Sequence, residues 1–225
     1  IGAATRQLIG NIFSLEDMGE KTLKGFADPI PVTRVTGEKY AESRFEAAHG
    51  QSITQIVGRE PEIALLLDRW ATARNGENQV VLLSGEAGIG KSRLLEALTS
   101  KLQETEHFRL RFQCSPYYAN SALNPFIRQL ERAAEIDPGD DDGAKLDKLE
   151  ALLRQGGDDL AFSVPVTALL LSIPFEGRYG ALALTPQQIK QRTMEGLIGQ
   201  LFGLAAKKPV IFLFEDAQWI DPTSL

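Results

Sequence analysis

One run of eight residues constrains the fold of this 225-residue chain more than any other feature. The run is Gly85-Glu86-Ala87-Gly88-Ile89-Gly90-Lys91-Ser92, with the spacing G-x-x-x-x-G-K-S. An apolar run at residues 80–83 precedes it and predicts a strand buried on both faces. Leucines recur on one side of residues 93–102, which predicts an amphipathic helix. A strand, a glycine-rich turn and a helix in this order predict an α/β fold whose turn is shaped to hold an anion.

The residue types in this turn suit a nucleoside triphosphate. Glycines let the backbone curl so that successive N–H groups face phosphate oxygens. The N-terminus of the following helix adds donors and a partial charge of roughly half an elementary charge. We predict that Lys91 reaches the β- and γ-phosphates and that the Ser92 hydroxyl joins the shell of a Mg²⁺ ion. This is the Walker A pattern, and it predicts ATP and Mg²⁺ as ligands.

A second pattern lies near the other end of the chain. Residues 210–214 form an apolar run that predicts a buried strand, and Glu215 and Asp216 follow it directly. A buried strand that ends in two carboxylates is the Walker B arrangement, in which one carboxylate holds Mg²⁺ and its neighbour orients or deprotonates water. The pattern leaves open which of the two faces the metal. The predicted catalytic residues are therefore Lys91, Glu215 and Asp216, and the predicted metal ligands are Ser92, Glu215 and Asp216.

The rest of the chain supplies alternating strands and helices. Residues 108–114 alternate apolar and polar and predict a more exposed strand, with Arg109 and Arg111 on its exposed face. A capping box from Thr185 to Gln188 opens a long helix. This alternation predicts a parallel, doubly wound sheet. One helix is expected to open at Pro61 and Glu62 and to end at Asn75-Gly76, and further helices are expected at residues 123–135, 143–155, 159–172 and 185–206.

Composition narrows the class of protein. A formal net charge of −6 argues against a surface that coats nucleic acid. A single cysteine excludes an intrachain disulfide, and the apolar stretch at 160–173 is too short to cross a bilayer. We therefore expect a cytoplasmic protein with neither nucleic acid nor a membrane as partner. Cys114 and Trp219 are expected to be buried, and Asp221 to cap a helix.

Three segments are expected along the chain. Residues 1–36 are too few to bury a core alone, residues 37–54 are polar and predict a linker, and residues 55–225 carry both nucleotide motifs. The chain begins without Met and stops after Asp221-Pro222, where a helix is expected to start. We therefore expect an internal fragment of a longer polypeptide. The acidic residues near Gly143 are expected to form a solvated loop and not a calcium site.

Residues 55–225 resemble the AAA-type ATPase module of bacterial signalling proteins, the STAND class of nucleotide switches. The resemblance rests on Val57-Gly58-Arg59-Glu60, on residues 85–93 and on Glu215-Asp216-Ala217-Gln218-Trp219-Ile220-Asp221-Pro222. It implies a P-loop NTPase fold, an αβα sandwich with a parallel sheet, and places Gly58 and Arg59 near the adenine end of the nucleotide. The family usually has Asp where this chain has Glu215. The residues expected to bind the nucleotide are Gly58, Arg59, Gly85, Glu86, Ala87, Gly88, Ile89, Gly90, Lys91, Ser92 and Arg93.

The first segment resembles the last strands of class III adenylate/guanylate cyclases. The resemblance rests on residues 2–6, 15–19, 23–26 and 29–35. Bacterial proteins that join such a cyclase to an AAA module are a known architecture, and the resemblance implies a nucleotide-dependent switch that regulates neighbouring domains in a protein that makes a cyclic nucleotide. Members of the ATPase class insert a later strand between the Walker A and Walker B strands, so the isolated fragment is expected to bind nucleotide poorly or not to fold alone.

Two other functions are weighed against the switch. The unusual Glu215-Asp216 order favours a scaffold that binds nucleotide without turning it over. A small-molecule P-loop kinase would need an arginine-rich lid, and residues 102–210 show no such cluster. The kinase is therefore ranked last. ATPase activity of the fragment and its preference for ATP over GTP are left open, as is assembly into a homo-oligomer.

Overall fold

The computed structural model describes residues 1–9, 13–26, 28–38, 56–157 and 159–225. The chain divides into two compact units. The first unit comprises residues 1–71 and 79–101, and the second comprises residues 72–78 and 102–225. Of the predicted linker, residues 39–54 lie outside the described residues.

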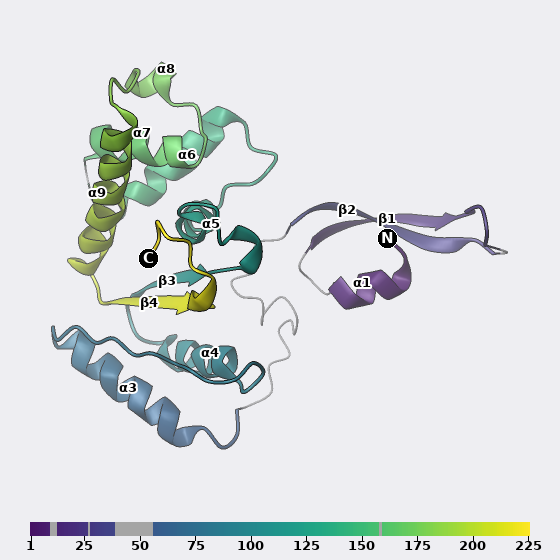
Figure 1. The fold of residues 1–225 in the computed structure, drawn as a ribbon, viewed down its shortest axis with the longest axis horizontal. Helices are drawn as coiled ribbons and strands as arrows, with labels where there is room; N and C mark the ends of the chain where they lie inside the picture. Colours follow the sequence, from purple (N-terminus) through teal and green to yellow (C-terminus); the bar gives the residue numbers. More distant parts are fainter. Residues whose placement is uncertain (10–12, 27, 39–55, 158) are drawn as a thin grey trace. The chain divides into compact units, whose positions relative to one another are not determined.

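The N-terminal part of the first unit is a helix and a β-hairpin. Helix α1 (Ala3–Ile9) precedes strands β1 (Phe13–Lys21) and β2 (Ile30–Glu38), which pair antiparallel. Strand β2 continues past residue 36, where the first predicted segment ends. An isolated bridge between Gly2 and Val32 ties the start of the chain to β2. The purple ribbon in Figure 1 follows this helix and hairpin.

Two predicted helices of the first unit are confirmed. Helix α3 (Glu60–Arg74) buries Ile63, Leu66 and Trp70, which recur at helical spacing on one face. Helix α4 (Lys91–Leu102) buries Leu94, Leu98 and Leu102 in the same manner. The end of α3 at Arg74 agrees with the Asn75-Gly76 stop signal.

The strand predicted at residues 80–83 is wrong. These residues form no strand, and the side chains of Val80 and Leu82 are 98% and 84% exposed. A strand is stable only when a neighbour pairs with its backbone groups. Among the described residues, β1 pairs with β2 and a parallel pair forms in the second unit, and neither pair includes residues 80–83.

The sheet of the second unit is parallel, as the sequence predicts. Strand β3 (Phe108–Gln113) pairs with β4 (Val210–Glu215) in a continuous register from Phe108↔Val210 to Gln113↔Glu215. Phe112 stacks on Phe212 with ring centroids 4.3 Å apart, and Phe126 lies 4.8 Å from Phe112. These aromatic contacts join the two strands to the helix that carries Phe126.

Helices form most of the second unit, and their positions agree with the sequence to within a few residues. Leu149 and Val164 are fully buried in the core that the central helices share. Asp141 caps one helix by accepting from the Ala144 N–H at 2.8 Å, and the predicted Thr185–Gln188 capping box is present. The elements are η1 (Pro116–Tyr118), α5 (Asn124–Ala133), α6 (Asp142–Arg154), α7 (Leu160–Leu170), α8 (Glu176–Tyr179), α9 (Pro186–Ala205) and the 3-10 turn η2 (Ala217–Trp219).

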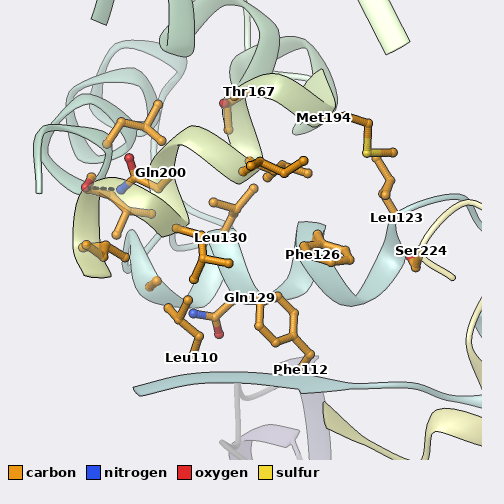
Figure 2. Close-up of a pocket in the computed structure, with 18 of the residues that line it drawn as sticks. Leu110, Phe112, Leu123, Phe126, Gln129, Leu130, Thr167, Met194, Gln200 and Ser224 are labelled. Carbon is orange, nitrogen blue, oxygen red and sulfur yellow. Dashed lines mark hydrogen bonds between the residues drawn. The ribbon is translucent and has the colours of Figure 1, made fainter. Parts of the chain in front are cut away.

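An apolar cavity of about 260 Å³ lies within the second unit. Figure 2 shows Leu110 and Phe112 of β3 on one side of it, with Met194 and Gln200 of α9 on the other. The Gln200 amide is already engaged, because it donates to the Leu152 carbonyl at 3.1 Å. The helices therefore cover the sheet without filling the space above it.

Across the part of the chain that the structure describes, no helix is both long enough and apolar enough to cross a lipid bilayer.

Candidate functional site

The Walker A residues form an exposed turn that leads directly into a helix. Gly88 and Gly90 have φ values of 79° and 100°, a region that residues with a side chain rarely adopt. Helix α4 begins at Lys91, and the Leu94 N–H donates to the Gly90 carbonyl at 3.0 Å. The N–H groups of the first helical turn have no partner within the helix and point toward its N-terminal end. The glycine turn and the helix start that the sequence predicts are therefore present, and anion binding by this turn stays a prediction.

The Lys91 side chain folds back over this turn. Its ammonium donates to the carbonyl oxygens of Gly85 and Glu86, each at 2.9 Å. Ser92 and Arg93 follow in the first turn of α4, where both are half-buried. A positive charge, backbone donors and a hydroxyl are therefore gathered within a few residues of one another.

Arg59 contacts the same turn from a distant part of the sequence. Its guanidinium donates to the Ile89 carbonyl at 3.3 Å and to the Glu62 carboxylate at 2.7 Å. The second bond lowers the pKa of Glu62 below its ordinary value. Gly58 precedes Arg59 with a φ of 76°, and its N–H donates to the Glu60 carboxylate at 3.2 Å. Arg59 therefore lies beside the turn, while its predicted role near the adenine stays a prediction.

The Walker B residues close strand β4 in the second unit. Glu215 is the last residue of the strand and is only 6% exposed. Asp216 follows it, is half-buried, and has left-handed backbone angles of φ 56° and ψ 37°. Its carboxylate accepts from the Gln218 side-chain amide at 3.3 Å. The two neighbouring acids therefore have different surroundings.

The prediction that Arg111 lies on an exposed strand face is wrong. The Arg111 side chain is 3% exposed, and its Nε donates to Glu215 Oε1 at 2.6 Å. The parallel register sets the carboxyl ends of β3 and β4 side by side, so the guanidinium lies within reach of the carboxylate. Arg109 is half-buried. The signal in the sequence that could have indicated this ion pair was an arginine on one predicted strand and an acid at the end of another.

Asp221 lies in the same region and holds several backbone groups. Its buried carboxylate accepts from the N–H groups of Leu123, Thr223 and Ser224 at 3.0–3.2 Å. Burial alone would raise the pKa of Asp221, but these bonds and one from the Ser224 hydroxyl outweigh it and lower the pKa. No helix follows Asp221 in the described residues, so the predicted helix cap is wrong: Asp221 caps a turn at residues 222–224 and also holds the residue before α5.

The two remaining predictions near this strand end have opposite outcomes. Cys114 is buried as predicted, at 1% exposure. Burial, together with the charges of Asp221 and Asp216, raises the pKa of its thiol to about 11. Trp219 is 43% exposed, so its predicted place in the core is wrong. It lies at the end of the short turn η2, all of whose residues are exposed.

The structure therefore groups the predicted residues into two sets. Gly58, Arg59 and the Walker A residues belong to the first unit, and Glu215 and Asp216 to the second. Within the described residues, no three His, Cys, Asp or Glu side chains come together as a metal site. A serine hydroxyl and phosphate oxygens are ligands that suit Mg²⁺, so the chemistry of Ser92 fits a cation that is bound together with a nucleotide. Binding of Mg²⁺ by this chain stays a prediction.

Comparison with known proteins agrees with these motifs. Over its full length the chain is 32% identical to an uncharacterized protein, R02095, of Rhizobium meliloti (strain 1021), and it spans 21% of that relative. No solved structure matches significantly. The model of the AAA ATPase domain family matches residues 55–225, which is more than half of the chain. The chain therefore belongs to the AAA ATPase domain family.

Proposed function

We propose that this chain binds ATP with Mg²⁺ at the Walker A turn, and that the bound nucleotide regulates neighbouring domains of a longer signalling protein. The observation that carries the proposal is the position of the Lys91 ammonium, 2.9 Å from two carbonyl oxygens of the turn. A phosphate oxygen carries more negative charge than an amide carbonyl and makes a stronger bond to an ammonium. Lys91 would therefore exchange these carbonyls for the phosphates of a nucleotide.

The remaining residues of the turn would act around the same phosphates. The N–H groups near Gly88 and Gly90 would donate to phosphate oxygens, because the positive φ values turn the backbone inward. The Ser92 hydroxyl would hold the cation directly or through water. A bound Mg²⁺ ion would neutralise phosphate charge and polarise the phosphoryl oxygens.

Thermal unfolding of the purified full chain tests nucleotide binding. ATP with Mg²⁺ at 100 times its dissociation constant stabilises a folded binding site by about 2.7 kcal/mol. Lys91→Ala should abolish most of the resulting shift in melting temperature. Lys101→Ala is the matched control, since it removes an exposed lysine from the last turn of the same helix. An unchanged shift in Lys91→Ala, or no shift in the wild type, would contradict the proposal.

Nucleotide binding without turnover is the second candidate function. It is favoured by the buried ion pair between Glu215 and Arg111, which occupies one of the two Walker B acids. The measurement is release of inorganic phosphate from ATP over many turnovers. Release that disappears in Asp216→Asn excludes the second candidate, and release that no Walker B substitution affects indicates a contaminating ATPase.

We also infer that residues 1–36 end a nucleotidyl cyclase domain. The inference is supported by the antiparallel pairing of β1 with β2 and by the resemblance of this segment to the last cyclase strands. The test is cyclic AMP formation by a longer polypeptide that contains this chain. We expect Lys91→Ala to change the rate of formation relative to Lys101→Ala. Equal rates in both variants would contradict regulation by the bound nucleotide.

A further inference from the structure

The proposed function does not use the apolar cavity of the second unit. Its volume is about 260 Å³, and every residue that lines it belongs to that unit. None of the described residues that line it carries a charge, and most of them are aliphatic or aromatic. An apolar cavity of about 150 Å³ stays dry and holds a molecule of the size of benzene. The cavity is therefore large enough for a small organic molecule.

One polar group at the cavity lacks a hydrogen-bond partner. Gln129 of α5 lies among the apolar side chains that line the cavity (Figure 2), and it is 8% exposed. Its side-chain oxygen accepts from the Arg132 guanidinium, which can only donate, so the other end of the amide is the nitrogen. The hydrogen bonds within the described part of the chain include none from that nitrogen. An acceptor placed in the cavity would give this amide its missing bond.

Two other polar side chains of the lining are already engaged within the fold. The Thr167 hydroxyl donates to the Ser163 carbonyl at 2.8 Å, and the Gln200 amide donates to the Leu152 carbonyl at 3.1 Å. A charged or strongly polar molecule would lose its hydration in this cavity without gaining enough partners in return. The lining therefore favours an apolar molecule with a single acceptor.

We propose that this cavity binds a small, uncharged and mostly apolar molecule whose one oxygen acceptor takes the free N–H of Gln129. In proportion to a cavity that holds benzene, the volume suits about ten non-hydrogen atoms. A bicyclic ketone has this size and this chemistry. The site is independent of the proposed nucleotide site at Lys91, because it lies wholly within the second unit.

The cavity also borders the residues that follow β4. Phe212 of β4 lines it, and so do Leu123 and Ser224. The N–H groups of Leu123 and Ser224 both donate to the Asp221 carboxylate. A bound molecule would therefore contact the chain on both sides of Glu215, and it would stabilise this end of the strand.

Fluorine NMR titration of the full chain with fluorotetralone, a bicyclic ketone, tests the site. Fluorotetralin lacks the carbonyl, and fluoronaphthoate has a similar size but carries a charge. We expect saturable binding of one fluorotetralone per chain and no saturable binding of fluoronaphthoate. Gln129→Glu keeps an oxygen for Arg132 but removes the amide donor. It should weaken fluorotetralone relative to fluorotetralin by at least about fivefold, because the carbonyl is left without a partner.

A cavity-filling variant provides a second test that does not depend on Gln129. Ala133 of α5 lines the cavity, and Ala133→Leu should weaken both uncharged probes by at least about fivefold through overpacking. Ala151→Leu is the matched control, because Ala151 is an exposed helical alanine outside the lining. It should change both dissociation constants by less than about twofold, as surface substitutions do. If Gln129→Glu does not fold, Ala133→Leu decides the test.

The outcomes separate this inference from the proposed function. Absence of saturable fluorotetralone binding would overturn it, and so would equal weakening by Ala133→Leu and Ala151→Leu. An unchanged preference for the ketone in a folded Gln129→Glu chain would overturn the role of the amide. Lys91→Ala should bind fluorotetralone as the wild type does, so loss of nucleotide binding alone leaves this inference standing.

Discussion

The two nucleotide motifs differ in how the surrounding fold holds them. The run before the Walker A turn, residues 80–83, is exposed and forms no strand. The run before the Walker B acids is β4, which pairs with β3 along its whole length. Both runs are continuously apolar, so composition does not distinguish them. The difference teaches that a paired neighbour, more than apolar character, decides whether such a run becomes a strand.

Matched leucines give the largest expected difference between the two runs. Leu213 is 6% exposed in β4, and Leu82 is 84% exposed before the Walker A turn. Leu213→Ala should lower the free energy of unfolding by about 2–5 kcal/mol through lost burial and the cavity it leaves. Leu82→Ala should change it by less than about 0.5 kcal/mol. Urea unfolding of both variants provides the measurement, and equal losses would show that residues 80–83 are buried in solution.

Two glycines of α9 test how tightly the second unit, which contains β4, is packed. A Cβ added at Gly203 would overlap the Gly156 carbonyl, whereas one added at Gly199 would meet nothing within 4 Å. We expect Gly203→Ala to destabilise the chain by about 1–3 kcal/mol through overpacking. Gly199→Ala should stabilise it by up to about 1 kcal/mol, because alanine loses less backbone entropy in a helix. Melting temperatures of the two variants that shift in the same direction would argue against the packing of α9 on Gly156.

The stability of the chain at low pH tests the hydrogen bonds of Asp221, which lies a few residues after β4. Hydrogen bonds from Ser224, Leu123 and Thr223 lower the pKa of Asp221 relative to the unfolded chain, despite its burial. Asp221 therefore stabilises the fold above its unfolded pKa of about 3.9, and this contribution is lost as the pH falls through the lower, folded value. The wild type should be more stable than Asp221→Asn at pH 7, with a smaller gap at pH 3. Unfolding curves at both pH values give the comparison, and a gap that widens in acid would contradict it.

The reactivity of cysteine thiols is expected to change stability least, but it compares the solvent exposure of the two motifs directly. Cys114 is buried beside β4, and its thiol pKa is raised to about 11, so at pH 8 it should react slowly with a thiol reagent until the chain unfolds. A cysteine placed in the exposed Walker A turn by Ala87→Cys, with Cys114→Ser to remove the native thiol, should react at the rate of a free thiol. Rapid modification of native Cys114 would show that this strand end opens to solvent.

Local signals in the sequence predicted the helices well. The apolar spacing of Ile63, Leu66 and Trp70 predicted the buried face of α3, and the Thr185–Gln188 capping box marked the start of α9. The Walker A turn was also predictable, because its shape depends on glycines at fixed positions within the turn itself. Each of these features is decided by residues close together in the chain.

The features that sequence analysis missed depend on residues far apart in the chain. The alternation of β3 predicted an exposed Arg111, and only the parallel register with β4 reveals that Glu215 lies beside it. The exposure of residues 80–83 likewise depends on pairing partners, and apolar composition carries no information about them. The family resemblance placed Arg59 near the adenine and gave no signal for its contact with the Ile89 carbonyl.

The folded-back position of Lys91 has a consequence for the thermodynamics of recognition. A lysine side chain loses up to about 2 kcal/mol of rotamer entropy when it is immobilised. Here the ammonium is already restrained by Gly85 and Glu86. Much of the rotamer entropy of Lys91 is therefore lost when the chain folds and not when a ligand binds. The entropic penalty of binding is correspondingly smaller.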